Sequence, residues 1–234
     1  METLDTLGRH SGPRGDVVLR RRHGVDEAVE ELIVNGVFAM DSIDTWTERR
    51  LAEMALAGHP ARKVLVGGLG LGYTADRFLR TDVGQVDVVE VEGCLVDWAY
   101  AGLTPTLATV AGDSRVTLHV ADVTAVLAGL RPEPRGPWDA IALDIDNGPD
   151  FLIHGANSAL YTEPNMAAAY AALSEGGTLA IWCQGPAPEL LATLQRICPT
   201  ARPQAYQRVR EGRRLSYVIY TATKPGSAGR AEQE

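Results

Sequence analysis

The chain has 234 residues, of which 45% are hydrophobic, so it can bury the core of one large domain, or of one domain with a small appendage. Its formal net charge of −8 argues against non-specific nucleic-acid binding and against attachment to an anionic membrane surface. No apolar run approaches the roughly 18 residues of a membrane span, and the N-terminus lacks the apolar core of a secretory signal, so we expect a cytoplasmic protein.

The first part of the chain predicts a small β-hairpin unit followed by a linking helix. Residues 1–14 are polar and contain Gly and Pro, so we expect them to be loose. Asn35-Gly36 stands between two apolar runs and is the strongest short hairpin signal. In chain order, the expected elements are a strand over 16–22, strands over 28–34 and 37–40, and a helix over 44–57 capped by Asp44 or Thr45.

A regular alternation of strands and helices follows. The expected strands are 63–66, 85–91, 115–120, 138–144 and 177–183, and the expected helices are 73–80, 95–102, 123–130, 163–173 and 189–197. Two further strands, 204–210 and 215–221, form an antiparallel hairpin. Together they predict an α/β fold, a doubly wound, mostly parallel seven-stranded Rossmann-like sheet. We divide the chain into residues 1–57, a nucleotide-binding domain over 58–224 and a disordered tail over 225–234.

A glycine-rich loop joins the strand over 63–66 to the helix that begins at Tyr73. The glycines of this loop are Gly67, Gly68, Gly70 and Gly72. Without a Cβ, the backbone can approach a ligand closely, and the helix N-terminus that follows offers free N–H groups. The pattern therefore predicts a nucleotide-binding loop, and the alternative is a tight turn without a ligand.

Acidic residues end the next three strands, at the edge of the sheet where α/β proteins bind ligands. Glu90 lies about twenty residues after the glycine loop, a spacing that suits a carboxylate accepting both ribose hydroxyls. Asp122 is placed to accept from an adenine amine, or to cap the helix at Val123. Asp144 begins a polar cluster with Asp146 and Asn147 and has no helix to cap for nearly twenty residues, so a role in chemistry is favoured.

Residues 30–190 resemble the spermidine synthase family, and more broadly the class I S-adenosylmethionine-dependent transferases. The segments that match are 32–37, 67–72, 89–90, 115–122, 138–144 and 158–162, together with the N-terminal hairpin unit. The resemblance implies Glu90 on the ribose, Asp122 and Val123 at the adenine, and Asp144 facing the transferred group. The expected cofactor-binding residues are Gly67, Gly68, Gly70, Gly72, Glu90, Val91, Asp122, Val123 and Asp144.

The chain departs from this family on the acceptor side. Gly70 stands where the family has the aspartate that holds the aminopropyl donor, Ala39 where it has a glutamine, and Glu48 where it has a tyrosine. Loss of the loop acid removes an unfavourable neighbour for a carboxylate, which favours intact S-adenosylmethionine. We therefore expect methyl transfer to a small-molecule nucleophile, with aminopropyl transfer from decarboxylated S-adenosylmethionine as the alternative.

Either transfer is an attack on a carbon next to a sulfonium, so the protein mainly orients the reactants. Asp144 and Asp146 are the expected catalytic residues, which orient or deprotonate the nucleophile. The expected substrate-side residues are Glu48, Asn147, Trp182 and Gln184, although Trp182 is equally well explained as a core residue. The apolar segment 148–161 is expected to be a lid, and its alternative is a packed surface loop.

Two other classes of function remain open, a nucleotide-dependent dehydrogenase and a non-catalytic nucleotide-binding partner subunit. The closing hairpin and the Asp144 cluster fit a transferase better than a dehydrogenase. The three cysteines and five histidines lack disulfide or metal-ligand spacing, so we expect reduced thiols and no metal. The hairpin unit over 16–41 is too small to be stable alone, and we expect it to contribute to a homodimer interface.

Overall fold

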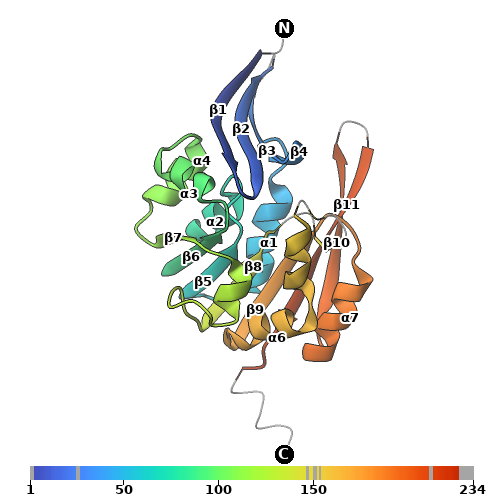
Figure 1. Cartoon of the computed structure of the whole chain (residues 1–234). Coiled ribbons are helices and arrows are strands. Elements are labelled where there is room, and N and C mark those ends of the chain that lie inside the picture. The colour runs from blue at the N-terminus through green and yellow to red at the C-terminus, as the bar shows by residue number, and fades with distance from the viewer. Residues whose placement is uncertain are drawn as a thin grey trace, which may run out of the picture.

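The computed structural model describes residues 3–24, 27–145, 148–149, 152, 154–210 and 213–226. It contains a four-stranded antiparallel sheet and a seven-stranded sheet flanked by helices (Figure 1). The smaller sheet has the order β1-β2-β3-β4, with β1 (Thr3–Gly12), β2 (Gly15–His23), β3 (Ala28–Val34) and β4 (Val37–Asp41).

Strand β1 corrects the expectation that residues 1–14 are loose. It pairs with β2 from Thr3 opposite His23 to Gly12 opposite Gly15, and the two strands form the long arm at the top of Figure 1. Most side chains of β1 are exposed, so its sequence shows neither apolar alternation nor a buried run. The strand forms because its backbone pairs with that of β2, and such pairing leaves no periodic pattern in the sequence.

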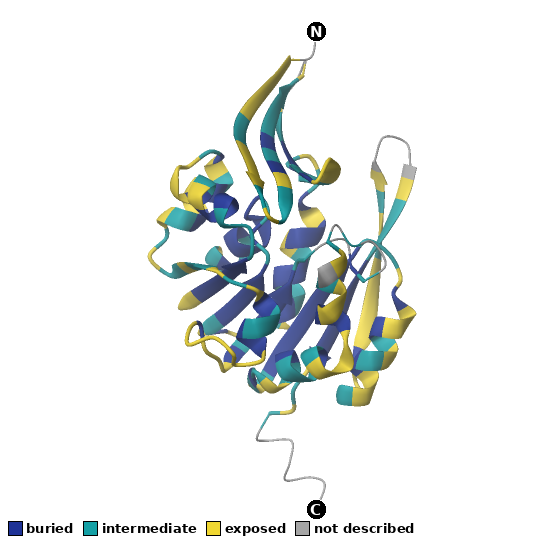
Figure 2. Ribbon diagram, viewed as in Figure 1, coloured by how far each residue is buried: buried dark blue, intermediate teal, exposed yellow. Residues whose placement is uncertain are grey.

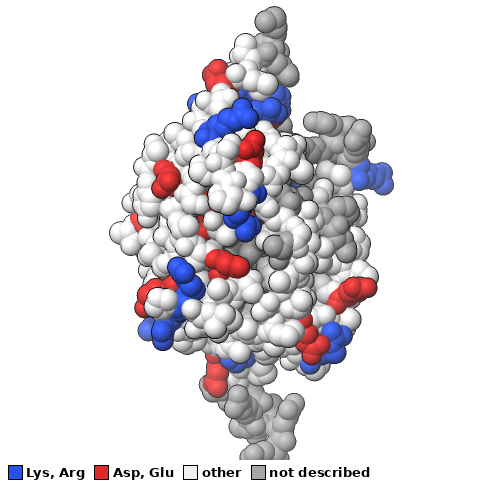
Figure 3. Space-filling model, viewed as in Figure 1, with Lys and Arg blue, Asp and Glu red and all other residues white. Residues whose placement is uncertain are grey.

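The hairpin between β3 and β4 is confirmed. Asn35 and Gly36 have φ of 53° and 75°, and two successive positive φ angles are what a type I′ hairpin turn requires. On β2 and β3, Arg20 and Arg22 both pair with the buried Glu31. Lys and Arg side chains, drawn in blue, lie over the arm in Figure 3.

The larger sheet confirms the expected doubly wound fold. Its order is β10-β11-β9-β8-β5-β6-β7, with β5 to β9 parallel and β11 antiparallel to both β9 and β10. Its strands are β5 (Lys63–Gly67), β6 (Gln85–Glu90), β7 (Val116–Val120), β8 (Trp138–Leu143), β9 (Leu173–Cys183), β10 (Arg202–Arg210) and β11 (Arg213–Thr223). The expected turn at 211–212 lies outside the described residues.

The helices cover both faces of this sheet. They are α1 (Trp46–Leu56), α2 (Tyr73–Leu79), α3 (Gly93–Tyr100), α4 (Pro105–Gly112), α5 (Val123–Leu127), α6 (Glu163–Ala171) and α7 (Pro188–Ile197), with the 3₁₀ helix η1 (Gly155–Tyr161). Helix α4 is not among the elements expected from the sequence. Its start at Thr104-Pro105 is nevertheless a recognisable signal, since Thr104 caps the helix by accepting from Leu107 N–H through Oγ1 and Pro105 is its first residue. No helix in the described part of the chain is long and apolar enough to span a membrane.

The central strands are buried on both sides, as Figure 2 shows. Along β5, Val64 and Val66 face the core formed with α1 to α4, whereas Leu65 faces the core formed with α5 to α7. The same alternation runs through β8 and β9, because successive side chains of a strand point to opposite faces. The buried residues of β2 and β3 join the first of these cores, which fixes the small sheet beside the carboxyl end of β5.

Candidate functional site

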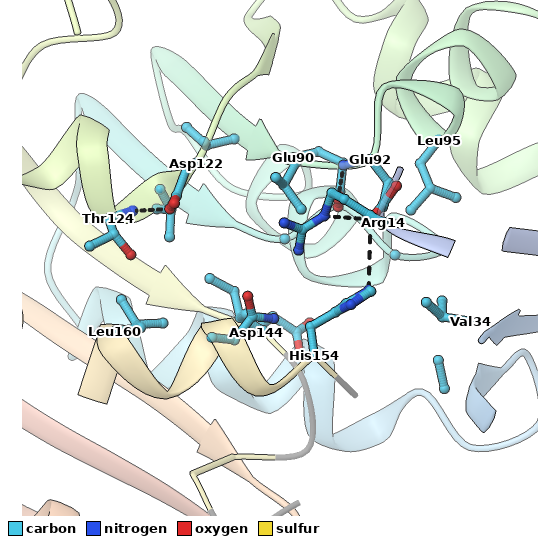
Figure 4. A pocket seen from close by; sticks show the side chains of 18 of the residues that line it. Arg14, Val34, Glu90, Glu92, Leu95, Asp122, Thr124, Asp144, His154 and Leu160 are labelled. Atoms are coloured by element: carbon cyan, nitrogen blue, oxygen red, sulfur yellow. Dashed lines mark hydrogen bonds and ion pairs between the residues drawn. The ribbon is translucent and has the colours of Figure 1, made fainter. Parts of the chain in front are cut away.

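A cavity of about 230 Å³ lies at the carboxyl ends of β5, β6 and β8 (Figure 4). The glycine loop, the residues after β6, β7 and β8, and the N-terminal part of α1 line it. The β1–β2 turn, β3, β4 and η1 contribute its remaining walls. The small sheet therefore closes a site that opens at the expected edge of the large one.

The glycine loop lies against the polypeptide that follows β8. Gly68 has φ of +92°, and a Cβ placed on it would come within 2.2 Å of the Asp144 carbonyl oxygen, so a side chain is excluded there. Gly68 N–H donates to the Val89 carbonyl at 2.8 Å. Gly68 and Gly70 line the cavity, whereas Gly67 ends β5 and Gly72 is the N-cap of α2.

Glu90 is buried at the end of β6 and is held by two backbone donors. Its Oε2 accepts from Leu69 N–H and its Oε1 from Glu92 N–H, each at 2.8 Å. Burial raises the pKa of Glu90, and these two hydrogen bonds oppose that rise by stabilising the carboxylate. Each oxygen keeps a further lone pair, so the carboxylate can still accept from ligand hydroxyls.

Asp122 caps a helix and also borders the cavity. Its Oδ1 accepts from Thr124 N–H at 2.8 Å, which makes it the N-cap of α5. It also lines the cavity, together with Val123 and Val91. Its contact with an adenine stays a prediction, since the cap explains the acid without a ligand.

Asp144 and Glu48 form a pair of carboxylates at the other end of the cavity. Thr74 Oγ1 donates to Asp144 Oδ2 at 2.6 Å, and Thr47 Oγ1 donates to Glu48 Oε2 at 2.9 Å. Burial raises the pKa of Glu48, and the negative charge of Asp144 raises it further. Burial likewise raises the pKa of Asp144, which the Thr74 bond partly offsets. A buried acid, Glu48, and a half-buried acid, Asp144, share this end of the site.

A thioether fills the space beside Gly70. A Cβ on Gly70 would lie 2.7 Å from Met40 Sδ, and Leu71 N–H donates to the same sulfur at 3.4 Å. Ala39, next to Met40, also lines the cavity. The cavity wall at Gly70 is therefore formed by the loop backbone and the apolar side chain of Met40. The carboxylates of Glu48, Glu90 and Asp144 come instead from α1, β6 and the segment after β8.

The remaining substrate-side predictions are placed differently. Trp182 is buried at the end of β9, where its ring centroid lies 5.5 Å from that of Tyr217, and it also lines the cavity. It is part of the core, and its contact with a substrate stays a prediction. Gln184 lies in the bend after β9 and is not among the described residues that line the cavity. Asp146 and Asn147 lie outside the described residues, so their roles stay predictions.

The expected lid over 148–161 is partly described. Its second half forms η1, in which Tyr161 donates through its hydroxyl to the Ile145 carbonyl at 2.8 Å. His154, Asn157 and Leu160 line the cavity from this segment. The segment therefore borders the site, and its movement as a lid stays a prediction.

Sequence reasoning missed Arg14, Glu92 and His154. Arg14 Nε donates to Glu92 Oε1 at 2.8 Å, and His154 Nε2 lies 3.8 Å from the same oxygen (Figure 4). No local signal in the sequence links these residues, since 78 positions separate Arg14 from Glu92.

The cavity is predominantly acidic. Five of its described lining residues are acids, namely Glu48, Glu90, Glu92, Asp122 and Asp144, whereas Arg14 is its one arginine or lysine among the described residues. Carboxylates in a partly buried site favour a cationic ligand, because a positive charge offsets their desolvation.

Comparison with known proteins gives structural likeness at low sequence identity. The spermidine synthase from Thermotoga maritima matches with a TM-score of 0.73 and 20% identity over 94% of this chain and 72% of that one. A spermidine synthase in complex with the transition-state analogue AdoDATO gives 0.72 at the same identity and coverage. A probable spermidine synthase from Corynebacterium glutamicum gives 0.60 at 16%, over 92% of this chain and 79% of that one. By sequence, neither a family model nor a curated protein matches.

These likenesses establish the fold. The chain has a spermidine synthase-like fold, in which its four-stranded sheet precedes the seven-stranded Rossmann-like sheet. A fold of this kind hosts more than one chemistry, so the function has to be argued from the cavity.

Proposed function

We propose that this spermidine synthase-like chain transfers an aminopropyl group from decarboxylated S-adenosylmethionine to a small primary amine. The observation that carries the proposal is the pair formed by the buried Glu48 and the half-buried Asp144 at one end of an acidic cavity, whose other end holds Glu90. Two neighbouring acids that are removed from water bind a cation favourably, and both the donor and the acceptor of this reaction are cations.

The same pair argues for the decarboxylated donor. Intact S-adenosylmethionine carries a carboxylate, which Glu48 and Asp144 would repel, whereas the decarboxylated form brings only positive charge. Our preference for methyl transfer rested on the missing acid at Gly70. Glu48 reverses that preference, because its side chain, from the first turn of α1, provides an acid in the cavity where the glycine loop provides none.

The structural likenesses support this choice. The likeness covers nearly the whole chain and includes proteins described as spermidine synthases, one of them in complex with AdoDATO. These names belong to those proteins, and at 20% identity or less they add weight without deciding the reaction.

Each end of the cavity then has a task. Glu90 accepts from the ribose hydroxyls, and Asp122 and Val123 border the base. A bound donor supplies its own leaving group, since the amine bonds to the carbon beside the sulfonium while the carbon–sulfur bond breaks and its electrons stay on sulfur. Asp144 takes the proton that the attacking amine must lose, and its raised pKa suits a base working near neutral pH. Glu48 holds an ammonium group beside it.

The test is to incubate the purified chain with either donor and a panel of short diamines, and to identify products by mass spectrometry. We expect 5′-methylthioadenosine and an amine enlarged by one aminopropyl group, from the decarboxylated donor. S-adenosylhomocysteine formed from the intact donor would instead show methyl transfer. If both donors bind and neither reacts with any amine, the non-catalytic alternative stands.

Methyl transfer remains the second candidate because of one observation. At Gly70 the cavity wall has no side chain, and the thioether of Met40 fills the adjacent space. The carboxylate of intact S-adenosylmethionine would therefore meet a thioether, and no acid, at that wall. An intact donor whose carboxylate points toward Gly70 avoids repulsion by Glu48.

We further propose that the chain is a homodimer. Three large apolar side chains are exposed in or next to the hairpin unit: Val37 on β4 (48%), Ile43 between β4 and α1 (56%) and Trp46 at the start of α1 (41%). Exposed apolar residues that gather in one region favour contact with a partner surface. Light scattering at micromolar concentration tests this, and a strict monomer would contradict it.

A further inference from the structure

The turn between β1 and β2 reaches the cavity and is held there by Asn35. Asn35 Nδ2 donates to the Arg14 carbonyl at 3.2 Å, and its Oδ1 accepts from Asp16 N–H at 3.0 Å. Gly15 has φ of +111°, and a Cβ on it would come within 1.7 Å of Asn35 Oδ1, so this contact requires glycine. The position of Arg14 is therefore fixed by the hairpin beside it.

The guanidinium of Arg14 is only partly satisfied. Its Nε donates to Glu92 Oε1 at 2.8 Å, whereas its Nη2 is shielded from solvent and has no hydrogen-bond partner within the described part of the chain. Figure 4 shows this group beside Glu90, directed into the cavity. A charged donor that is shielded and unpaired is costly, so a ligand atom that accepts from Nη2 would remove that cost.

Glu90 offers the complementary half of such a contact. Its carboxylate oxygens, each already bound to one backbone N–H, can accept from ligand groups and cannot donate to them while ionised. Arg14 can donate and cannot accept. A group that satisfies both must give one hydrogen and offer a lone pair, and a hydroxyl does so.

We propose that Arg14 is a ribose-recognition residue, whose Nη2 donates to a sugar hydroxyl that in turn donates to Glu90. The β1–β2 arm would then take part in reading the nucleoside. This inference rests on the proposed function only in that the donor is a nucleoside, and it holds for either transferred group.

The test is calorimetry with 5′-methylthioadenosine and its 2′-deoxy and 3′-deoxy analogues on the wild type, Arg14→Met and Arg9→Met. Arg9 lies on the same arm, 68% exposed, and is the matched control. Arg14→Met should weaken binding of 5′-methylthioadenosine roughly 10-fold or more, the scale of a hydrogen bond to a charged group. Loss of the contacted hydroxyl should weaken binding by the wild type more than binding by Arg14→Met, because the variant has only the Glu90 half of the contact left to lose. Arg9→Met should match the wild type.

A purely structural Arg14 would give a different pattern. Arg14→Met would then weaken all three nucleosides by one common factor, or none of them, and either result overturns the inference while the proposed function stands. If the wild type does not bind 5′-methylthioadenosine at all, the nucleoside donor and this inference fall together. Should Arg14→Met not fold, Arg14→Lys keeps the charge, lacks the second donor arm, and should lose the same discrimination between hydroxyls.

Discussion

The two ends of the cavity hold their acids in different ways. Glu90 ends β6 and Asp144 directly follows β8, and these two strands flank β5. Glu90 accepts from two backbone N–H groups, whereas Asp144 accepts from one threonine hydroxyl and has Glu48 as a neighbour. The backbone thus prepares the nucleoside end to accept hydrogen bonds before a ligand arrives. At the transfer end burial raises the pKa of both acids, and a cationic ligand would favour their ionised forms.

The largest expected effect comes from the transfer end. Asp144→Asn keeps the shape of the side chain and removes its charge, so turnover should fall by about 10²-fold or more, while affinity for the nucleoside changes little. Steady-state rates, calorimetry and thermal melting on this one variant measure the three quantities. Asp97→Asn, the same change at an exposed position on α3, is the control and should leave the rate unaltered.

A combined loss of melting temperature and nucleoside affinity in Asp144→Asn would contradict this prediction. It would show that the carboxylate only fixes the polypeptide after β8 through Thr74.

The nucleoside end should respond in the opposite way. Glu90→Ala removes the acceptor for the ribose and the partner of the Leu69 and Glu92 amides, so binding should weaken by about 1–3 kcal/mol. At saturating donor the rate should fall far less than in Asp144→Asn. Calorimetry and rates over a range of donor concentrations separate the two effects, and unchanged affinity in a folded variant would remove Glu90 from the site.

The difference between the two ends also decides what was predictable. Glu90 and the glycine loop follow from a general rule, since parallel strands bring their carboxyl ends to one edge and Glu90 comes at the expected spacing. The cap formed by Asp122 is equally local. These features depend on residues that are near in sequence, or on the topology of the sheet.

The contributions that were missed come from distant parts of the chain. Arg14 meets Glu92 across 78 positions, from the turn that follows β1, a strand whose exposed residues give no periodic signal. The resemblance to spermidine synthases points to Glu48 only as the residue that stands where the family has a tyrosine. Its charge becomes important because α1 places it close to Asp144. Contacts of this kind depend on how the small sheet and α1 pack against the large one, which no single-sequence pattern states.

Glu48 provides a sharper comparison, because its charge is proposed to decide which donor binds. Glu48→Gln should reduce the preference for decarboxylated over intact S-adenosylmethionine, measured as the ratio of the two kcat/KM values, by about 10-fold, the scale of one partly buried charge. An unchanged ratio would mean that Glu48 does not face the donor and would return weight to methyl transfer through the wall at Gly70.

The smallest expected effect is on stability, and it again separates the two ends. The raised pKa values of Glu48 and Asp144 mean that the folded chain keeps protons on these carboxyls where the unfolded chain has released them. The unfolded state then binds fewer protons, so this contribution makes the free energy of unfolding decrease as the pH rises above the ordinary values near 4. Glu48→Gln removes one of the two acids, so it should melt at a higher temperature than the wild type at about pH 8 and show little difference at about pH 5. A shift of a few degrees is expected, since about 1 kcal/mol corresponds to roughly 2–4 °C in a chain of this size.

A diamine added at pH 8 should raise the melting temperature of the wild type more than that of the variant, because the ligand supplies the positive charge that the two acids lack. Equal shifts in both proteins would show that the amine binds elsewhere.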